Sequence, residues 1–223
     1  MAQTRQAEVI VIGGGLAGLA AAAYAARAGR SVLLCEKAAG LGGRAATSAA
    51  GGYRFNLGPH ALYRGGPATQ VLGELGVAFR GHAPATSGAF AVAAGAAHAL
   101  PGGFVSLLAT GLFGLSAKLE TAKLLAGFAK LDPTPLQRTS VSDWLAGSIR
   151  HPAVRELVGA LVRVSSYTAD HDRMSAGAAI AQVQEALGHG VLYLDDGWQT
   201  LVDGLRDAAL NAGAQLLTGA RAA

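Results

Sequence analysis

Residues 8–36 read EVIVIGGGLAGLAAAAYAARAGRSVLLCE, and this stretch decides the fold. Glu8–Ile12 is a short apolar, β-branched run, which predicts a central parallel strand covered on both faces. Gly13–Gly18 then turns the chain, and the Ala- and Leu-rich run Leu16–Ala28 predicts a helix that ends before Gly29. Residues 31–35 (SVLLC) predict a second strand. The stretch therefore predicts a strand-helix-strand unit and an α/β fold.

The turn in this unit has the spacing Gly13-x-Gly15-x-x-Gly18. The spacing alone is weak in a chain with 32 glycines, but here it follows a predicted strand and opens a predicted helix. Each glycine then has a physical task in a dinucleotide-binding turn. Gly13 makes the tight turn, Gly15 lets the backbone approach a diphosphate, and Gly18 lets the helix and strand pack closely.

The residues around the turn complete a candidate dinucleotide site. A diphosphate would lie on the N–H groups at the helix N-terminus, where Leu16 and Ala17 stand. The second strand is followed by Glu36, 18 residues after Gly18, and then by Lys37. The Glu36 carboxylate would accept hydrogen bonds from the ribose hydroxyls, and its charge disfavours a 2′-phosphate. We therefore expect FAD or NAD rather than NADP.

A second glycine motif follows at Leu41-Gly42-Gly43-Arg44, with Thr47 shortly after it. With the first motif and the acidic residue, it resembles the N-terminal signature of the flavin-dependent amine oxidase and phytoene desaturase superfamily. In that superfamily a GGR motif followed by Ser or Thr contacts the FAD diphosphate. The resemblance implies that Gly42, Gly43 and Arg44 bind the cofactor, and that this cofactor is FAD.

The resemblance continues over residues 52–60, GYRFNLGPH. They are similar to the superfamily's segment Gly-aromatic-x-apolar-Asp-x-Gly-Pro, which passes near the flavin, with Asn56 where an Asp is common. This similarity adds Gly58, Pro59 and His60 to the cofactor-binding candidates. Residues 193–205 also resemble a superfamily segment, with Asp196 in place of its first Gly.

The resemblance implies a Rossmann-like FAD/NAD(P)-binding domain with a mostly helical inserted substrate domain. We expect residues 1–100 to form the first part of the FAD-binding domain, including a hairpin within 88–100. Residues 101–190 are expected to form the helical insertion, and Ser140 with Asp143 predicts a capping box within it. Residues 191–223 are expected to return to the FAD-binding domain incompletely. Superfamily members are about twice this length and carry a late Gly-Asp motif, so we expect a chain truncated at its C-terminus.

Composition excludes several classes of protein. The chain has 223 residues, of which 51% are hydrophobic and 14% charged, so intrinsic disorder is excluded. Its net charge is +4, but Lys and Arg are scattered singly, which does not favour nucleic-acid binding. One cysteine, Cys35, allows no intrachain disulfide and no zinc spacing, so we expect no metal and a cytoplasmic location. Phe104–Leu115 is either a core helix or a helix in peripheral contact with a membrane.

The function expected from this resemblance is an FAD-dependent oxidoreductase that dehydrogenates or desaturates a bulky apolar substrate, isoprenoid or carotenoid-like. Flavin carries such chemistry itself, which agrees with the lack of a visible acid-base constellation, and no catalytic residue is assigned. Two alternatives stay open. One is an amine-oxidising enzyme of the same superfamily, and the other is a truncated dinucleotide-binding remnant without catalytic activity.

Overall fold

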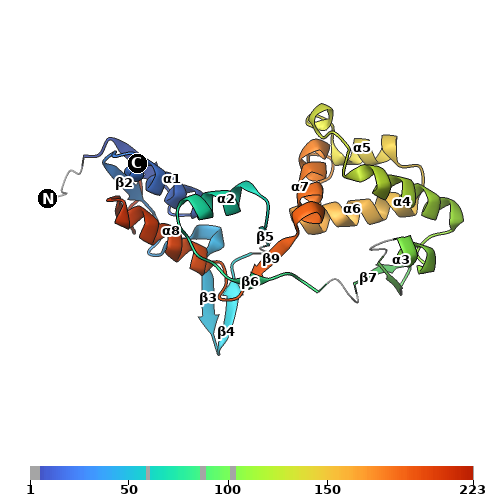
Figure 1. Ribbon diagram of the computed structural model, residues 1–223, viewed down its shortest axis with the longest axis horizontal. Helices are drawn as coiled ribbons and strands as arrows, with labels where there is room; N and C mark the ends of the chain where they lie inside the picture. The colour runs from blue at the N-terminus through green and yellow to red at the C-terminus, as the bar shows by residue number, and fades with distance from the viewer. Residues whose placement is uncertain (1–5, 59–60, 86–88, 101–103, 223) are drawn as a thin grey trace. The chain divides into compact units, whose positions relative to one another are not determined.

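The computed structural model describes residues 6–58, 61–85, 89–100 and 104–222 (Figure 1). The chain divides into two compact units. The sheet unit comprises Met1–Pro84 and Val191–Ala223, and the helical unit comprises Ala85–Gly190. In sequence, the helical unit is therefore an insertion into the sheet unit.

The sheet unit is built around a three-stranded parallel sheet of order β1-β2-β10, in which Val9 pairs with Val32 and Gln215 with Leu33. A β3-β4 hairpin and a small antiparallel sheet of order β5-β9-β6 complete it. Its elements are β1 (Val9–Ile12), α1 (Leu16–Arg27), β2 (Val32–Cys35), the 3-10 turn η1 (Gly43–Ala45), β3 (Thr47–Ala50), β4 (Tyr53–Asn56), β5 (Leu62–Tyr63), α2 (Pro67–Glu74), β6 (Gly81–His82), β9 (Val191–Leu194), α8 (Gln199–Asn211) and β10 (Gln215–Leu217). The predicted strand-helix-strand unit is confirmed.

The core of this unit lies where α1 and α8 pack side by side (Figure 1). The buried face of α1 is mostly alanine, with Ala22, Ala23 and Ala26 lying beside Leu19. Such small side chains let a second helix approach closely, and α8 fills the space with Leu201, Val202 and Leu205 among others. This packing holds the N-terminal end of α1, where the glycine turn lies.

The strand β1 differs from the expectation. It lies at the edge of the three-stranded sheet, and β2 takes the central place because β10 pairs with its other side. On one face of β1, Ile10 is 59% exposed and Ile12 is 72% exposed. The prediction of a central strand covered on both faces is therefore wrong for β1 within the described residues.

The segment from Ala38 to Gly52, which is rich in Gly, Ala, Ser and Thr, contains η1 and β3. The strand β3 has the sequence TSAA, which has little β-propensity of its own. It forms because it pairs with β4 in an antiparallel hairpin, from Thr47 opposite Asn56 to Ala50 opposite Tyr53. Pairing with the neighbouring strand, rather than the preference of its own residues, decides this element.

The helical unit has its own core, in which Trp144, Ile149 and Ile180 are buried. Its α5 begins as predicted, because the Ser140 hydroxyl accepts a hydrogen bond of 3.0 Å from the Asp143 N–H. The elements are β7 (Phe90–Ala93), β8 (Ala96–Ala99), α3 (Phe104–Ala109), α4 (Leu115–Phe128), the 3-10 turn η2 (Thr134–Leu136), α5 (Val141–Ser148), α6 (Pro152–Ser166) and α7 (Ala176–His189). Among the helices of the described ranges, none is long and apolar enough to cross a membrane.

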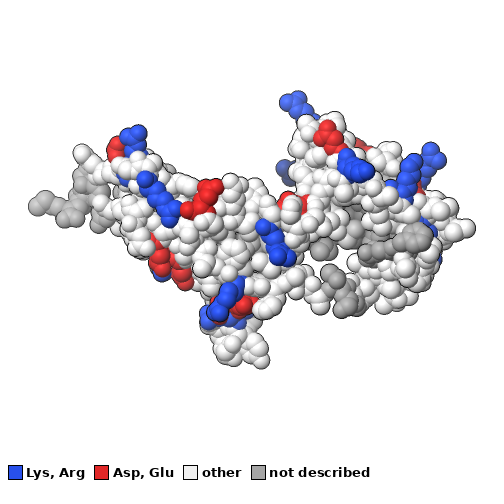
Figure 2. Space-filling view, viewed as in Figure 1, with Lys and Arg blue, Asp and Glu red and all other residues white. Residues whose placement is uncertain are grey.

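The β7-β8 hairpin appears where the sequence predicts it, but it belongs to the helical unit. The expected boundary lay after residue 100, whereas the units divide after Pro84. One contact that ties the hairpin to the helices is a 2.8 Å hydrogen bond from the Thr110 hydroxyl to the Ala99 carbonyl. On the face shown in Figure 2, basic side chains stand apart in isolated groups, several of them beside acidic ones.

Candidate dinucleotide-binding site

The glycine turn between β1 and α1 is shaped by its own backbone. Gly13 has a φ of +102°, which side chains rarely tolerate, and its N–H donates a 2.8 Å hydrogen bond to the Cys35 carbonyl. A Cβ atom at Gly18 would fall well inside van der Waals contact of the Gly13 carbonyl oxygen and 3.1 Å from its carbon. Glycine at position 18 is therefore required for the turn to close against α1.

Gly14, which the spacing leaves as an unspecified position, has a clear role in the structure. Its N–H donates a 2.7 Å hydrogen bond to Oε2 of Glu36. A Cβ at this position would overlap Leu41 and lie 3.2 Å from the Cβ of Glu36. Sequence reasoning missed Gly14, although three glycines in a row were a signal that more than two close approaches occur here.

Glu36 is held as an anion at the end of β2. Its side chain is buried, and Oε1 accepts a second hydrogen bond, of 2.8 Å, from the Ala38 N–H. The N–H groups of Ala38 and Gly14 hold the pKa of the Glu36 carboxyl below its ordinary value of 4.5. The carboxylate is thus ionised at neutral pH and fixed beside the glycine turn, and its remaining lone pairs can accept hydroxyl donors.

The second glycine motif lies directly against the first. Gly42 donates a 2.7 Å hydrogen bond from its N–H to the Gly14 carbonyl, and Gly42 and Gly15 form an isolated parallel β-bridge. Gly42 has a φ of +109°, and a Cβ there would lie 3.1 Å from the Val202 side chain. The structure therefore brings together the Gly13–Gly18 turn, Glu36 and Gly42.

The N-terminus of α1 offers donors and space. Gly15 is the N-cap residue of α1, and no described side chain caps it. A Cβ at Gly15 would have only the Gly42 carbonyl oxygen nearby, at 3.8 Å, and one at Gly43 would meet nothing within 4 Å among the described atoms. The N–H groups of the first turn, which includes Leu16 and Ala17, have no helical acceptor, so the turn fits a phosphate-type anion.

The remaining candidate cofactor-binding residues are Lys37, Arg44, Gly58, Pro59 and His60. Lys37 and Arg44 are exposed, Lys37 directly after Glu36 and Arg44 within η1. Gly58 follows β4 by two residues and is partly buried. Pro59 and His60 lie outside the described residues. Cofactor contacts of these five residues stay predictions.

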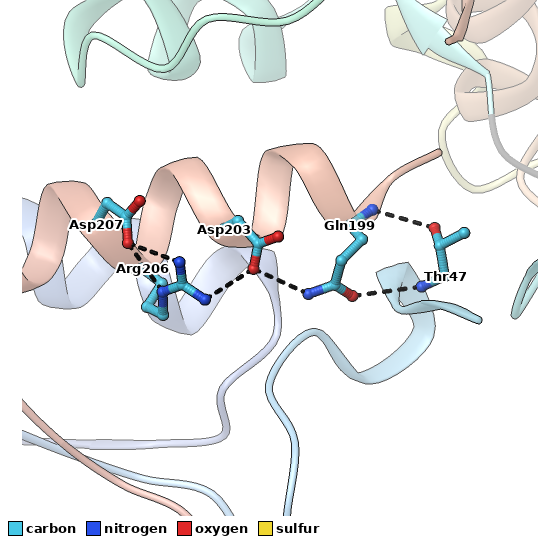
Figure 3. A network of polar contacts seen from close by, with 5 residues as sticks. All are labelled: Thr47, Gln199, Asp203, Arg206 and Asp207. Atoms are coloured by element: carbon cyan, nitrogen blue, oxygen red, sulfur yellow. Dashed lines mark hydrogen bonds and ion pairs between the residues drawn. The ribbon is translucent and has the colours of Figure 1, made fainter. Parts of the chain in front are cut away.

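A polar network anchors the segment after the second motif to α8 (Figure 3). The Gln199 N–H donates to the Thr47 hydroxyl at 3.1 Å, and the Thr47 N–H donates to Oε1 of Gln199 at 3.4 Å. Along α8 the Gln199 side-chain amide donates to Asp203, and Arg206 forms ion pairs of 2.9 Å with Asp203 and Asp207. The loop that carries Gly42–Arg44 is therefore fixed at its far end by Thr47.

Asn56 also bonds to Thr47 and to the residue before α8. Its Oδ1 accepts hydrogen bonds from the Thr47 hydroxyl at 2.6 Å and from the Trp198 N–H at 3.2 Å. The buried Gly197 has a φ of +76°, and a Cβ there would crowd Thr47 and Asn56 at 2.6–2.9 Å. In this chain Asn56 therefore ties the β3-β4 hairpin to the start of α8, a role that an amide oxygen fills without a charge.

Comparisons with known proteins agree with this geometry. The family of NAD(P)-binding Rossmann-like domains matches residues 11–75, which contain both glycine motifs and Glu36. A carotenoid 3,4-desaturase of Haloarcula japonica is 52% identical over 52 residues, 23% of this chain and 10% of the relative. One of the limonene dehydrogenase polypeptides of Castellaniella defragrans is 46% identical over 63 residues, 28% of this chain and 11% of the relative.

The likeness extends over the whole chain at the level of fold. The structure of a putrescine oxidase variant with redesigned cofactor binding superimposes with a TM-score of 0.72 at 20% identity, covering 98% of this chain and 52% of the oxidase. This chain thus spans about half the length of that protein, and its sequence match spans about a tenth of each curated relative. The resemblance inferred from the sequence is confirmed at the level of fold: residues 11–75 match NAD(P)-binding Rossmann-like domains, part of the chain is similar to a carotenoid desaturase, and the chain has a fold similar to that of putrescine oxidase.

Proposed function

We propose that the chain binds FAD and serves as an FAD-dependent oxidoreductase for a bulky apolar substrate, isoprenoid or carotenoid-like. The observation that carries this proposal is the meeting of two glycine motifs and a buried anionic glutamate at the N-terminus of one helix. Gly14 bonds to Glu36 on one side and to Gly42 on the other, so the three features form one site.

The residues of this site have separate tasks toward the cofactor. The N–H groups at the start of α1 would donate to the diphosphate, with Gly15 leaving room for it. Glu36 would accept hydrogen bonds from the ribose hydroxyls, and Gly42–Arg44, in the adjoining loop, would contact the diphosphate. When bound, FAD supplies the acceptor for the substrate's hydride.

The substrate class rests on two relatives. Within the helical unit, a groove between α4, α6 and α7, to which Trp144 of α5 also contributes, is lined by apolar side chains, among them Leu125, Phe128, Leu161 and Leu187. Three of these leucines reach solvent, and no charged group lines the groove to pair with an ammonium ion. At about 40 Å³ the groove is too small for a bulky substrate, so the support for an apolar substrate comes from the relatives named for a carotenoid and for limonene.

Gly15→Ala tests the cofactor assignment without breaking the fold. The backbone at Gly15 is extended, with a φ of −77°, and a Cβ there meets no protein atom closer than 3.8 Å. The methyl group would instead stand where the diphosphate must approach. We expect the unaltered chain to retain visible flavin absorption after incubation with FAD and desalting, and Gly15→Ala to bind FAD on the order of tenfold more weakly or worse.

The matched control is Gly73→Ala, in α2, where a Cβ also meets nothing within 4 Å. It is expected to bind FAD like the unaltered chain. A folded but colourless chain would contradict the proposal that these 223 residues suffice to bind FAD and would favour the non-catalytic remnant. A rise in melting temperature with NAD but not with FAD would contradict the flavin assignment itself.

A second experiment separates the two substrate classes. The flavin-loaded chain is mixed anaerobically with a carotenoid polyene, with limonene or with putrescine, and loss of the flavin's visible absorption is followed. Reduction by the polyene or limonene is expected. Reduction by putrescine alone would favour the amine-oxidising alternative, which the fold match to putrescine oxidase keeps open.

A further inference from the structure

The helix α8 contacts the loop of the second glycine motif at two points. We call residues 42–47 the motif loop. At its start, a Cβ on Gly42 would stand 3.1 Å from the Val202 side chain. At its end, Thr47 is hydrogen-bonded to Gln199. Gln199 and Val202 are three residues apart and therefore lie on the same side of α8. One face of this helix thus meets both ends of the motif loop.

Two hydrogen bonds join Gln199 to Thr47 (Figure 3). The Gln199 N–H donates to the Thr47 hydroxyl at 3.1 Å, a bond that any residue except proline could make at position 199. The Thr47 N–H donates to Oε1 of Gln199 at 3.4 Å, and this bond needs the side chain. Together the two bonds close a ring between the end of the motif loop and the first turn of α8.

Asp203 sets the orientation of the Gln199 amide. The Nε2 group of Gln199 donates a 3.2 Å hydrogen bond to Oδ1 of Asp203, one turn further along α8. The same Oδ1 accepts a 2.9 Å hydrogen bond from Arg206, which holds the carboxylate in place. If the amide were turned over, its NH₂ group would face the Thr47 N–H, and its oxygen would face a carboxylate. Asp203 therefore ensures that Gln199 presents an acceptor to Thr47.

The middle of the motif loop depends on its ends. The Ala45 N–H donates to the Gly42 carbonyl at 3.0 Å, and the Ala46 N–H donates to the Gly43 carbonyl at 3.2 Å. These two bonds form the single turn η1, which stands directly before Thr47. Such a short turn has little stability of its own, so its conformation relies on what anchors the flanking residues.

We propose that Gln199, oriented by Asp203, is a positioning residue for the cofactor site. It holds Thr47 so that Gly43 and Arg44 keep the conformation in which they would contact the diphosphate of FAD. This role rests on the proposed function. Gln199 acts through Thr47, 152 positions away in sequence, so a helix that follows the insertion helps to shape a motif that precedes it.

Amide hydrogen exchange tests the positioning role in the chain without cofactor. Gln199→Met keeps the length of the side chain but can neither accept from Thr47 nor donate to Asp203. We expect the N–H groups of residues 45–47 to exchange about fivefold faster or more in this variant, because one hydrogen bond is lost. Those of residues 33–35 in β2 should exchange as in the unaltered chain. Unchanged exchange at residues 45–47 would overturn the proposal.

Titration with FAD tests the consequence for the cofactor. Gln199→Met and Thr47→Val are each expected to bind FAD about fivefold more weakly than the unaltered chain. The double variant should lose less than the product of the two single losses, because the two bonds belong to one ring and loss of either loosens the other. Thr47→Ser keeps the hydroxyl and should restore the affinity. Losses that multiply fully, or equal weakening by Thr47→Ser and Thr47→Val, would overturn the proposal. If Gln199→Met fails to fold, Thr47→Val serves for both measurements.

The matched control is Gln184→Met in the helical unit. The Gln184 side chain donates 2.8 Å hydrogen bonds to the Phe128 and Leu131 carbonyls, so its loss should lower stability without changing FAD affinity or exchange at residues 45–47. Equal loss of affinity in Gln184→Met and Gln199→Met would overturn the positioning role. Absence of FAD binding by the unaltered chain would instead reject the proposed function, and the exchange measurement would then decide the role of Gln199 by itself.

Discussion

Gly15 and Gly18 stand three residues apart in one turn, yet their missing side chains matter for different reasons. At Gly18 a Cβ would collide with the protein's own backbone at Gly13, whereas at Gly15 it would enter open space beside Gly42. Gly18 is thus needed for folding, and Gly15 for the approach of a ligand. Gly14, like Gly18, is needed for folding, because a Cβ there would overlap Leu41.

Gly18→Ala is therefore expected to destabilise the chain itself. We expect a loss of about 1–3 kcal/mol or more in the free energy of unfolding, the usual cost of forcing an atom into a packed site. Gly73→Ala, within α2, should instead be neutral or stabilise by up to about 1 kcal/mol, because alanine favours helix. Urea unfolding followed by circular dichroism measures both. Equal stability of the two variants would contradict the close packing at Gly18.

At this scale the spacing of the glycines and the position of Glu36 predicted that these residues lie together, and the structure brings them together. The roles of Gly14, Thr47 and Asn56 were not predictable in the same way. Their contacts join residues that are 22, 152 and 142 positions apart in sequence, to Glu36, Gln199 and Trp198 respectively. Which distant group meets them is set by packing, and no local pattern records it.

Among the elements, α4 and β1 show what periodicity does and does not reveal. The sequence of α4 predicts a helix. Because its apolar residues lie on both sides of that helix, the pattern does not say which face the core covers. A continuous apolar run likewise predicts a strand at β1 without showing that it lies at a sheet edge. The short strands β5 and β6, of two residues each, exist only through pairing with β9.

The loop between α5 and α6 provides a pH-dependent prediction. Hydrogen bonds from the Arg150 and His151 N–H groups hold the pKa of the Glu120 carboxyl below 4.5, its ordinary value. A lowered folded-state pKa means that the carboxylate stabilises the fold at pH values above 4.5, and that this contribution disappears as the pH falls through the lowered pKa. Glu120→Gln should therefore melt at a lower temperature than the unaltered chain at neutral pH, with the difference vanishing in acid.

The control for this experiment is Glu156→Gln, at an exposed position on α6. Its melting temperature should follow that of the unaltered chain across the same pH range. A gap between Glu120→Gln and the unaltered chain that persists unchanged in acid would refute the assigned role of the carboxylate.

On the scale of the whole molecule, the described residues form two hydrophobic cores that have no residue in common. One core lies in the sheet unit around Leu19, Leu34 and Leu201, and the other lies in the helical unit around Trp144 and Ile180. A domain with its own core can unfold as its own cooperative unit. The two tryptophans of the chain, Trp144 and Trp198, fall one in each unit.

We therefore expect two separable unfolding transitions. In a Trp198→Phe background, fluorescence reports the helical unit, and in a Trp144→Phe background it reports the sheet unit. Leu201→Ala should lower the stability reported by Trp198 by about 2–5 kcal/mol and leave that reported by Trp144 little changed, and Ile180→Ala should do the reverse. Coincident shifts of both transitions in either variant would show that the units unfold together.

The sequence by itself determined the β-α-β unit, the glycine turn, the acidic residue beside it and the helical character of the insertion, because each depends on residues close together in the chain. Only the tertiary structure decided that Gly14 joins the two glycine motifs, that β1 lies at the sheet edge and that the β7-β8 hairpin belongs with the helices. The same holds for the exposed face of α4. These features depend on which distant surfaces pack together, and burial and long-range hydrogen bonding are properties of the folded chain as a whole.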